Sequence, residues 1–218
     1  MRSRILFDYS VELHSQPATR QDEWVIETLR GQRDGYFVEI GANDGKHHSN
    51  TFALEKHFDW HGLLVEADPN LSDRSRFTRP NCKHDCVAVS TMDANAAWFS
   101  CAGPWGGLIV FLPEAWKREA RDRHTPEIWV PTTTLRAVLK RNHVPLLVDY
   151  LSLDIEGAEV PVLDEYFKSP THHFRCLTVE VRDSDTLMQV RRIVEPHGYV
   201  FEELRAWDAF FTYNPLRL

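Results

Sequence analysis

The stretch Phe37-Val38-Glu39-Ile40-Gly41-Ala42-Asn43-Asp44-Gly45 decides the fold class of this 218-residue chain. Its apolar half, Tyr36–Ile40, predicts a buried strand that runs directly into a glycine-rich turn. A helical pattern follows over residues 49–58, with Ser49 as the expected cap. A buried strand, a tight turn and a helix in this order predict the ligand-binding edge of an α/β sheet.

The turn narrows the kind of ligand. Gly41 allows the backbone to turn tightly where a ligand approaches. Gly45 is expected to open the following helix, whose free N–H groups favour a carboxylate or phosphate. The G-x-G-x-x-G spacing of nicotinamide-binding proteins is missing, because Asn43 stands where the second glycine belongs. The turn therefore suits an amino-acid carboxylate, such as the methionine end of S-adenosylmethionine, better than a pyrophosphate.

Strands and helices alternate along most of the remaining chain. The pattern predicts strands over 63–65, 86–89, 149–155, 177–181, 199–203 and 210–213, and helices over 20–30, 132–141 and 185–196. This alternation predicts a Rossmann-like, doubly wound and mostly parallel α/β sheet, whose ligands bind beyond the carboxyl ends of the strands. We expect residues 1–218 to form a single domain with an N-terminal arm over residues 1–19.

The segment 98–131 does not fit the alternation. It holds four of the seven tryptophans, namely Trp98, Trp105, Trp116 and Trp129. Two interpretations carry equal weight: an insertion over the active-site edge, or a hairpin and helix whose tryptophans only pack. Glycines and a proline flank Trp105, so we expect this residue to contact an acceptor as part of a lid. The other three tryptophans are expected to pack.

An acidic residue ends the second predicted strand. Glu66 lies 25 positions after Gly41, where nucleoside-binding sheets place the carboxylate that holds the ribose hydroxyls. Asp68 is the close alternative, but its position before Pro69 suits a helix cap. We therefore assign the ribose to Glu66 and the cap to Asp68.

More acidic residues follow two later strands. Asp154 and Glu156 leave one of these strands, and Glu180 ends the next. Adjacent parallel strands would place Asp154 and Glu180 over the same pocket. Carboxylates there are costly unless they bind a cation, share a proton or reach solvent. Glu159 is expected at a solvated helix start, and Arg182 could neutralise Glu180 as a structural pair.

Five segments, in their order and spacing, resemble the FkbM-type methyltransferases over about residues 20–213: FVEIGANDG, GLLVEADP, CVAVS, DYLSLDIEGAEVPVL and LTVEV. The resemblance implies a class I methyltransferase fold with a seven-stranded sheet whose last strand runs antiparallel. It also implies methyl transfer from S-adenosylmethionine to a hydroxyl, often on a sugar or a polyketide-like product. It assigns the methionine portion to Glu39, Gly41 and Gly45, the ribose to Glu66, and the family's acidic motif to Asp154 and Glu156.

The predicted site follows from these assignments. The cofactor residues are Glu39, Gly41, Asn43, Gly45, Glu66 and Ala88. Asp154 and Glu180 are the predicted catalytic groups, acting directly on the hydroxyl proton or through a Mg²⁺ that they hold. Trp105 and Glu156 are expected to contact the acceptor. The predicted function is O-methylation of a sugar, glycoconjugate or natural product; the alternatives are an inactive Rossmann-like binding module and a nicotinamide-dependent oxidoreductase.

Composition limits the partners. The net charge of −7 argues against a broad surface for nucleic acid or membrane. The first 20 residues lack the apolar region of a secretory signal, so we expect a cytoplasmic enzyme with a small-molecule or carbohydrate acceptor. The oligomeric state is left open. Cys82, His84 and Cys86 alternate, which permits a zinc site lacking a fourth ligand or, more simply, the edge of a core strand.

Overall fold

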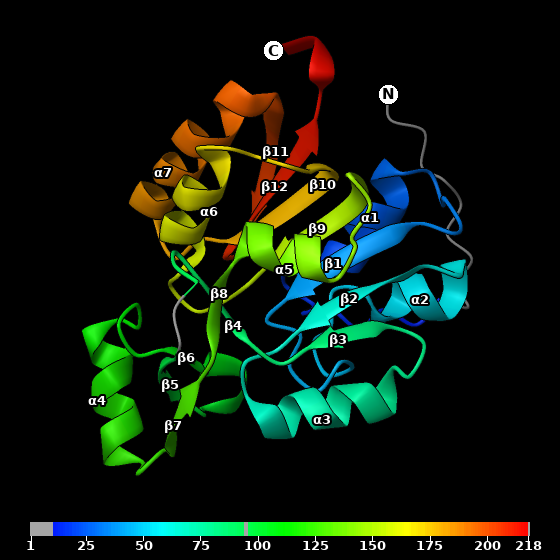
Figure 1. The fold of residues 1–218 in the computed structure, drawn as a ribbon. Coiled ribbons are helices and arrows are strands. Elements are labelled where there is room, and N and C mark those ends of the chain that lie inside the picture. Colours follow the sequence, from blue (N-terminus) through cyan, green and yellow to red (C-terminus); the bar gives the residue numbers. More distant parts are fainter. Residues whose placement is uncertain (1–10, 94–95, 218) are drawn as a thin grey trace.

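The computed structural model describes residues 11–93 and 96–217, and a seven-stranded sheet forms the centre of this part of the chain (Figure 1). The strand order is β11 (Tyr199–Arg205), β12 (Asp208–Tyr213), β10 (His173–Glu180), β9 (Leu147–Leu153), β1 (Tyr36–Ile40), β2 (His61–Val65) and β3 (Lys83–Asp85). β12 runs antiparallel to both of its neighbours, and the other neighbouring strands pair in parallel. This arrangement confirms the predicted α/β class and the antiparallel last strand.

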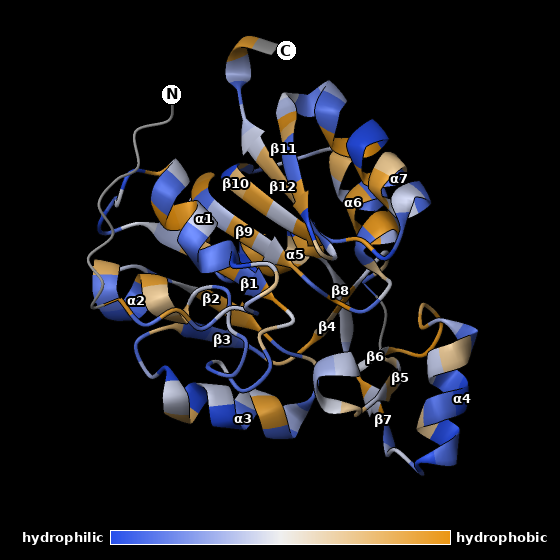
Figure 2. Ribbon diagram, turned by 180° about the vertical axis from the view of Figure 1, so that it is seen from behind, coloured by the Kyte–Doolittle hydropathy of each residue, from blue (hydrophilic) through white to orange (hydrophobic). Residues whose placement is uncertain are grey.

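Helices cover both faces of the sheet (Figures 1 and 2). One face carries α5 (Leu135–Arg141), α6 (Glu159–Phe167) and α7 (Ser184–Val194), the other carries α1 (Gln21–Thr28) and α2 (Phe52–Phe58), and α3 (Pro69–Thr78) lies beside β3. β1 shows why both faces are covered: Val38 joins the core under α5 to α7, and Phe37 joins the core that contains Trp24. Successive side chains of a strand point to opposite faces, so a strand without polar alternation needs cover on both.

The first residue of α3 agrees with the prediction from the sequence, and the first residue of α2 does not. α3 begins as predicted, with Asp68 Oδ1 accepting from the Asn70 N–H and Pro69 in the first helical position. α2 begins at Phe52, and its N–H donates to Ser49 Oγ at 3.1 Å. The prediction that Gly45 opens this helix is wrong, because a polar turn separates the two.

The predicted strand at 86–89 corresponds to β4 (Ala88–Ser90), which lies outside the central sheet. β3 ends at Asp85 on the edge of the central sheet, and β4 pairs instead with β8 (Thr132–Thr134). The predicted helix over 132–141 therefore starts only at Leu135. The three consecutive threonines of β8 favour a strand, and Thr134 Oγ1 then caps α5 by accepting from the Ala137 N–H at 3.2 Å.

The segment 98–131 has regular structure of its own. It contains a three-stranded sheet of β6 (Gly107–Leu108), β5 (Ala97–Ser100) and β7 (Glu127–Val130), the short helix η1 (Gly103–Trp105) and α4 (Glu114–Asp122). Phe99 and Val130 pack on Ala88 in a small core separate from those of the central sheet. In Figure 1 this unit projects from the lower left of the sheet.

Two further expectations concern zinc and membranes. The zinc interpretation is wrong for the described residues, because Cys82 donates to Glu55, and His84 donates to the Arg79 carbonyl at 2.9 Å, without meeting Cys86 in a ligand group. In the described part of the chain, no helix is both long enough and apolar enough to cross a membrane. Residues 1–10 of the predicted arm lie outside the described residues.

Candidate active site

A cavity of about 650 Å³ lies at the carboxyl ends of β1, β2, β9 and β10. This is the edge where a parallel sheet binds its ligands, and the volume falls within the roughly 300–1,000 Å³ of small-molecule sites. The lining also draws on the segment 98–131 and on Gln16 and Gln21 near the start of the described chain. The strand ends therefore meet at one site, as the sequence predicted.

The floor of the cavity is a backbone contact between two strand ends. Gly41 has a φ of +88°, and a Cβ at this position would overlap the carbonyl oxygen of Asp154. In the same place the Asp154 N–H donates to the Ile40 carbonyl at 3.1 Å. Only glycine tolerates both the positive φ and this approach. Gly41 thus brings the first turn against the acidic loop that follows β9.

Glu66 stands between the first turn and the end of β2. Its side chain lines the cavity and accepts from the backbone N–H groups of Asn43 and Asp68, each at 2.8 Å. Burial raises the pKa of this carboxyl to about 7, against the effect of the two hydrogen bonds. A carboxylate oxygen has room for a second donor, so Glu66 can still accept from a ligand hydroxyl.

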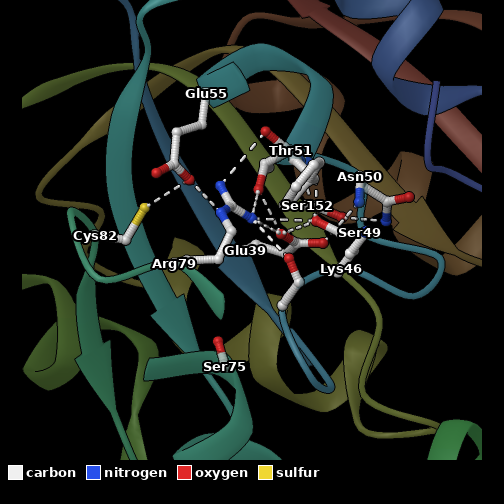
Figure 3. A network of polar contacts seen from close by, with 12 residues as sticks. Glu39, Lys46, Ser49, Asn50, Thr51, Glu55, Ser75, Arg79, Cys82 and Ser152 are labelled. Carbon is white, nitrogen blue, oxygen red and sulfur yellow. Dashed lines mark hydrogen bonds and ion pairs between the residues drawn. The ribbon is translucent and has the colours of Figure 1, made fainter. Parts of the chain in front are cut away.

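Glu39 belongs to a closed network behind the cavity (Figure 3). It accepts from Ser49 Oγ at 3.0 Å, from the Asn50 N–H at 2.7 Å and from Thr51 Oγ1. The Arg79 guanidinium lies 3.8 Å away. Burial raises the pKa of Glu39, while Arg79 and the hydrogen bonds lower it. Although Glu39 lines the cavity, its oxygens already serve to shape the turn.

Gly45 lies away from the position expected of a cofactor residue. Its φ is +78°, and a Cβ there would crowd Ser75 and Arg79 on the α3 side. Among the described residues that line the cavity, Gly45 is absent. The structure therefore gives this glycine a packing role against α3.

The remaining lining has an apolar part and a polar part. The apolar part consists of Val87, Ala88, Phe99 and Leu108, and the polar part of Gln16, His48 and Asn50. Gln16 Nε2 lies 2.8 Å from His48 Nδ1, and Asn50 Nδ2 donates to Ser152 Oγ at 2.9 Å. With Glu66 added, these surfaces fit a nucleoside joined to an amino acid. Sequence analysis missed Gln16 and Asn50, because neither lies in a recognisable motif.

Three carboxyl groups converge at the ends of β9 and β10. In the register of these strands Leu153 pairs with Val179, so Asp154 and Glu180 follow side by side. Oxygen atoms of Asp154, Glu156 and Glu180 all lie within 4.8 Å of one another. Glu156 joins the group through a left-handed backbone, with a φ of +59°. The predicted proximity of Asp154 and Glu180 is confirmed.

Burial and mutual repulsion shift the pKa of each member of this acid cluster upward. The pKa of Asp154 rises well above its usual value through burial and then through Glu180 and Glu156. Burial raises the pKa of Glu156 to about 8, although Arg182 opposes the shift. Burial and Glu156 raise the pKa of Glu180 to about 9. The cluster can therefore hold protons at neutral pH or exchange them for a cation.

Arg182 forms the ion pair with Glu180 that the sequence suggested, and it binds Glu156 more closely. Its Nη2 donates to Glu156 Oε2 at 3.0 Å and lies 3.9 Å from Glu180. Glu180 Oε2 is buried and has no hydrogen-bond partner within the described residues. The guanidinium thus hydrogen-bonds Glu156 and forms only a longer ion pair with Glu180.

Glu159 was expected at a solvated helix start, and this expectation is wrong. The residue is 3% exposed. Its carboxylate accepts from the backbone N–H groups of Ile155 at 2.7 Å and Gly157 at 2.9 Å. Glu159 therefore fixes the loop that presents Asp154 and Glu156. This structural role explains why the acidic motif contains a second glutamate.

The tryptophans divide into two groups. Trp105, which is 58% exposed, lines the cavity together with Trp116, whose ring lies under the Arg182 guanidinium at 4.4 Å. The expectation that Trp116 only packs is therefore wrong. Trp98 and Trp129 are exposed and stack on each other at 4.8 Å, outside the described lining.

Trp207 is a lining residue that sequence analysis missed. It lies in the turn between β11 and β12, and its carbonyl accepts from the Val181 N–H at 2.7 Å. Its sequence position, directly before the last strand, was the available signal. Because β12 is antiparallel, its start lies at the same edge of the sheet as the end of β10.

Comparison with known proteins assigns this chain a family and, separately, a fold. The sequence profile of the methyltransferase FkbM domain matches residues 39–213. No functionally curated protein matches the chain.

Among solved structures, the METTL16 methyltransferase domain superposes with a TM-score of 0.53 at 10% identity, covering 89% of this chain and 67% of that one. Methyltransferase FkbM from Methylobacillus flagellatus KT gives 0.50 at 14% identity, covering 83% of this chain and 44% of that one. This chain spans less than half of the latter protein, and both likenesses concern the class I methyltransferase fold.

Proposed function

Because the chain belongs to the FkbM family of methyltransferases, we propose that it methylates a hydroxyl of a sugar, glycoconjugate or natural product. Methyl transfer from S-adenosylmethionine follows from the family, and the hydroxyl acceptor is the proposed part. The observation that carries it is one cavity that joins Glu66 to the acid cluster of Asp154, Glu156 and Glu180. The proposal treats residues 1–218 as one cytoplasmic domain without a nucleic-acid or membrane partner.

Several residues would hold the cofactor. Glu66 would accept from the ribose hydroxyls, Ala88 offers an apolar surface for the adenine, and Gly41 and Asn43 place the backbone of the first turn. S-adenosylmethionine supplies a methyl group on a positively charged sulfur, which is already activated toward an oxygen nucleophile. The protein must therefore chiefly orient the acceptor and remove its proton.

Asp154 is the first candidate for proton removal. It lines the cavity, and its raised pKa makes the ionised form a stronger base than an ordinary carboxylate. Glu180 is the second candidate, because it lies within the same cluster. Glu156 and Trp105 are proposed to contact the acceptor.

A bound Mg²⁺ is a second way to acidify the hydroxyl. Carboxylate oxygens are the ligands that Mg²⁺ prefers, and Asp154 and Glu180 are proposed to hold it, with Glu156 in reach. If activity disappears on exhaustive chelation and returns with Mg²⁺, the metal-assisted form is supported. Full activity after chelation would leave Asp154 as the direct base.

The cofactor part is tested by calorimetry with S-adenosylhomocysteine. Glu66→Ala removes hydrogen bonds to a charged acceptor, each worth about 1.5–3 kcal/mol. At about 1.4 kcal/mol per decade, affinity should fall at least tenfold. Glu66→Gln is the matched control, because it preserves the size of the side chain and removes the charge. An unchanged affinity in Glu66→Ala would remove Glu66 from the site.

The same titration separates the alternative functions. The proposed enzyme binds S-adenosylmethionine and S-adenosylhomocysteine and does not bind NAD. Binding of NAD in their place would favour the oxidoreductase. Tight cofactor binding with no methyl transfer to any hydroxyl-bearing sugar or natural product would favour the inactive binding module.

A further inference from the structure

The acid cluster and three indole rings line the same cavity, and we infer that together they recognise a positively charged amino group on the acceptor, as in an amino sugar. The inference rests on the proposed function, because it specifies the acceptor of that same site. It selects an organic cation bearing hydroxyl groups over neutral or anionic molecules of the same shape.

The charge balance of the site is the first argument. Three carboxyls face one guanidinium, and that guanidinium already donates to Glu156 and stacks on Trp116. Glu180 is only 9% exposed, and its Oε2 has no hydrogen-bond partner in the described part of the chain. A buried carboxyl without a donor is costly, and an ammonium group can supply both the donor and the charge.

A fourth carboxyl, that of Asp208, is buried beside the acid cluster. Asp208 pairs with Glu180 in the register of β12 and β10 and is 2% exposed. Gln21 Nε2 donates to it at 2.8 Å, and burial raises its pKa to about 7. No cationic side chain in the described residues forms an ion pair with Asp208. The excess of carboxyls over guanidinium therefore continues along the sheet edge.

The indole rings are the second argument. A cation is attracted to the face of an indole, and the 4.4 Å contact of Arg182 with Trp116 shows one such pair at this cavity. Trp105 and Trp207 line the same space and are 58% and 43% exposed. Within the described residues their faces carry no aromatic or cationic partner. They are thus free to cover an organic cation.

The same indoles distinguish an ammonium group from a metal ion. Both cations would satisfy the carboxyls, but Mg²⁺ keeps oxygen ligands and water and gains nothing from an aromatic wall. Arg182 lies 3.9 Å from Glu180, and its charge repels a divalent ion more strongly than a monovalent one. The surroundings of the cluster therefore favour the organic cation.

The experiment uses the full chain saturated with S-adenosylhomocysteine. Methyl glucosides that carry an amino group at one ring carbon at a time are titrated beside the parent methyl glucoside and methyl glucuronide. We expect at least one amino sugar to bind tenfold or more tightly than both comparison sugars. Glu180→Gln should remove most of this preference, and Glu119→Gln, at an exposed carboxyl of α4, should keep it.

Each other outcome has a defined meaning. Equal binding of the neutral or anionic sugar, or no binding of any amino sugar, overturns the inference. Binding of Mg²⁺ that is required for the sugars to bind also overturns it, in favour of the metal. Failure to bind S-adenosylhomocysteine rejects the proposed function instead. Methyl transfer to the amine would overturn both O-methylation and the cation inference, because a nitrogen that accepts the methyl group must first lose its ammonium proton.

Discussion

Two groups of carboxyls in the described part of the chain are organised in opposite ways. Around Arg79, Glu39 and Glu55 have donors from neighbouring side chains and backbone, and the guanidinium also donates to the Gly45 carbonyl and Thr51. In the acid cluster, one arginine serves three carboxyls, and an oxygen of Glu180 has no partner within the described residues. The first network is complete when the chain folds.

The difference separates a structural region from the proposed ligand site. A buried charge with full hydrogen bonding holds its surroundings in one arrangement, whereas poorly compensated carboxyls cost stability. Functional sites are where proteins tolerate such a cost. The end of β1 links the two regions, because Glu39 belongs to the complete network and Gly41, two residues later, lies against Asp154.

The largest effect is expected from breaking the complete network. Arg79→Met leaves Glu39 buried without its cation, and loss of one partner of a buried pair costs about 3–5 kcal/mol. Urea denaturation should show this decrease in the free energy of unfolding. Arg33→Met is the control, because its partner Asp59 is exposed and such pairs contribute about 0–1 kcal/mol. Equal small losses in both variants would contradict the distinction.

An intermediate effect is expected from the incomplete cluster, and it depends on pH. The folded-state pKa of Glu180 is raised from 4.5 to about 9, so the folded protein binds more protons between these values. Its stability contribution is present at low pH and is lost as pH rises through about 9. Glu180→Gln cannot ionise, so its stability should fall less over this range, by on the order of 1–3 kcal/mol.

Denaturation of both proteins at several pH values from about 5 to 9 checks this prediction. The decline should be reduced and not abolished, because Asp154 and Glu156 still titrate. Glu114→Gln, at an exposed position of α4, should follow the unsubstituted protein. Parallel curves for Glu180→Gln and the unsubstituted protein would show that Glu180 carries no raised pKa.

The smallest effect on stability is expected at Trp105, which lines the cavity from the segment 98–131. Trp105→Ala removes an exposed ring, so the free energy of unfolding should change by about 0.5 kcal/mol or less. S-adenosylhomocysteine affinity should also stay nearly constant, while the acceptor KM rises or kcat falls. Trp129→Ala, outside the described lining, should leave both kinetic constants unchanged. A Trp105→Ala protein that unfolds easily would instead place Trp105 in the core.

The sequence predicted the order of helices and strands along the chain better than it predicted which sheet each strand joins. Local patterning located β1, β9 and β10, because buried strands leave continuous apolar runs. It could not show that β4 leaves the central sheet for β8, since that pairing joins Ala88 to Thr132, far apart in the chain. It also left 98–131 between two interpretations, because short strands there lack a long apolar run.

The sequence predicted those site residues that stand at or directly after the ends of strands. Glu66, Asp154 and Glu180 stand directly after or at the end of strands, and the topology brings them together. Gln16 and Trp207 reach the cavity from opposite ends of the chain, and only the tertiary fold reveals this. Gly45 shows the reverse error, since a glycine in a motif can serve packing alone.

The backbone contact between Gly41 and Asp154 also has a mechanical consequence. Gly41 lies directly against the Asp154 backbone, and the Asp154 N–H donates to the Ile40 carbonyl. The two strand ends therefore form a rigid floor of the cavity. Neither loop can swing aside without separating β1 from β9 at the middle of the sheet. The parts of the lining that can move are therefore η1 and the segment around Gln16, which lie outside this contact. Ligands of different bulk would deflect those parts and leave the floor unmoved.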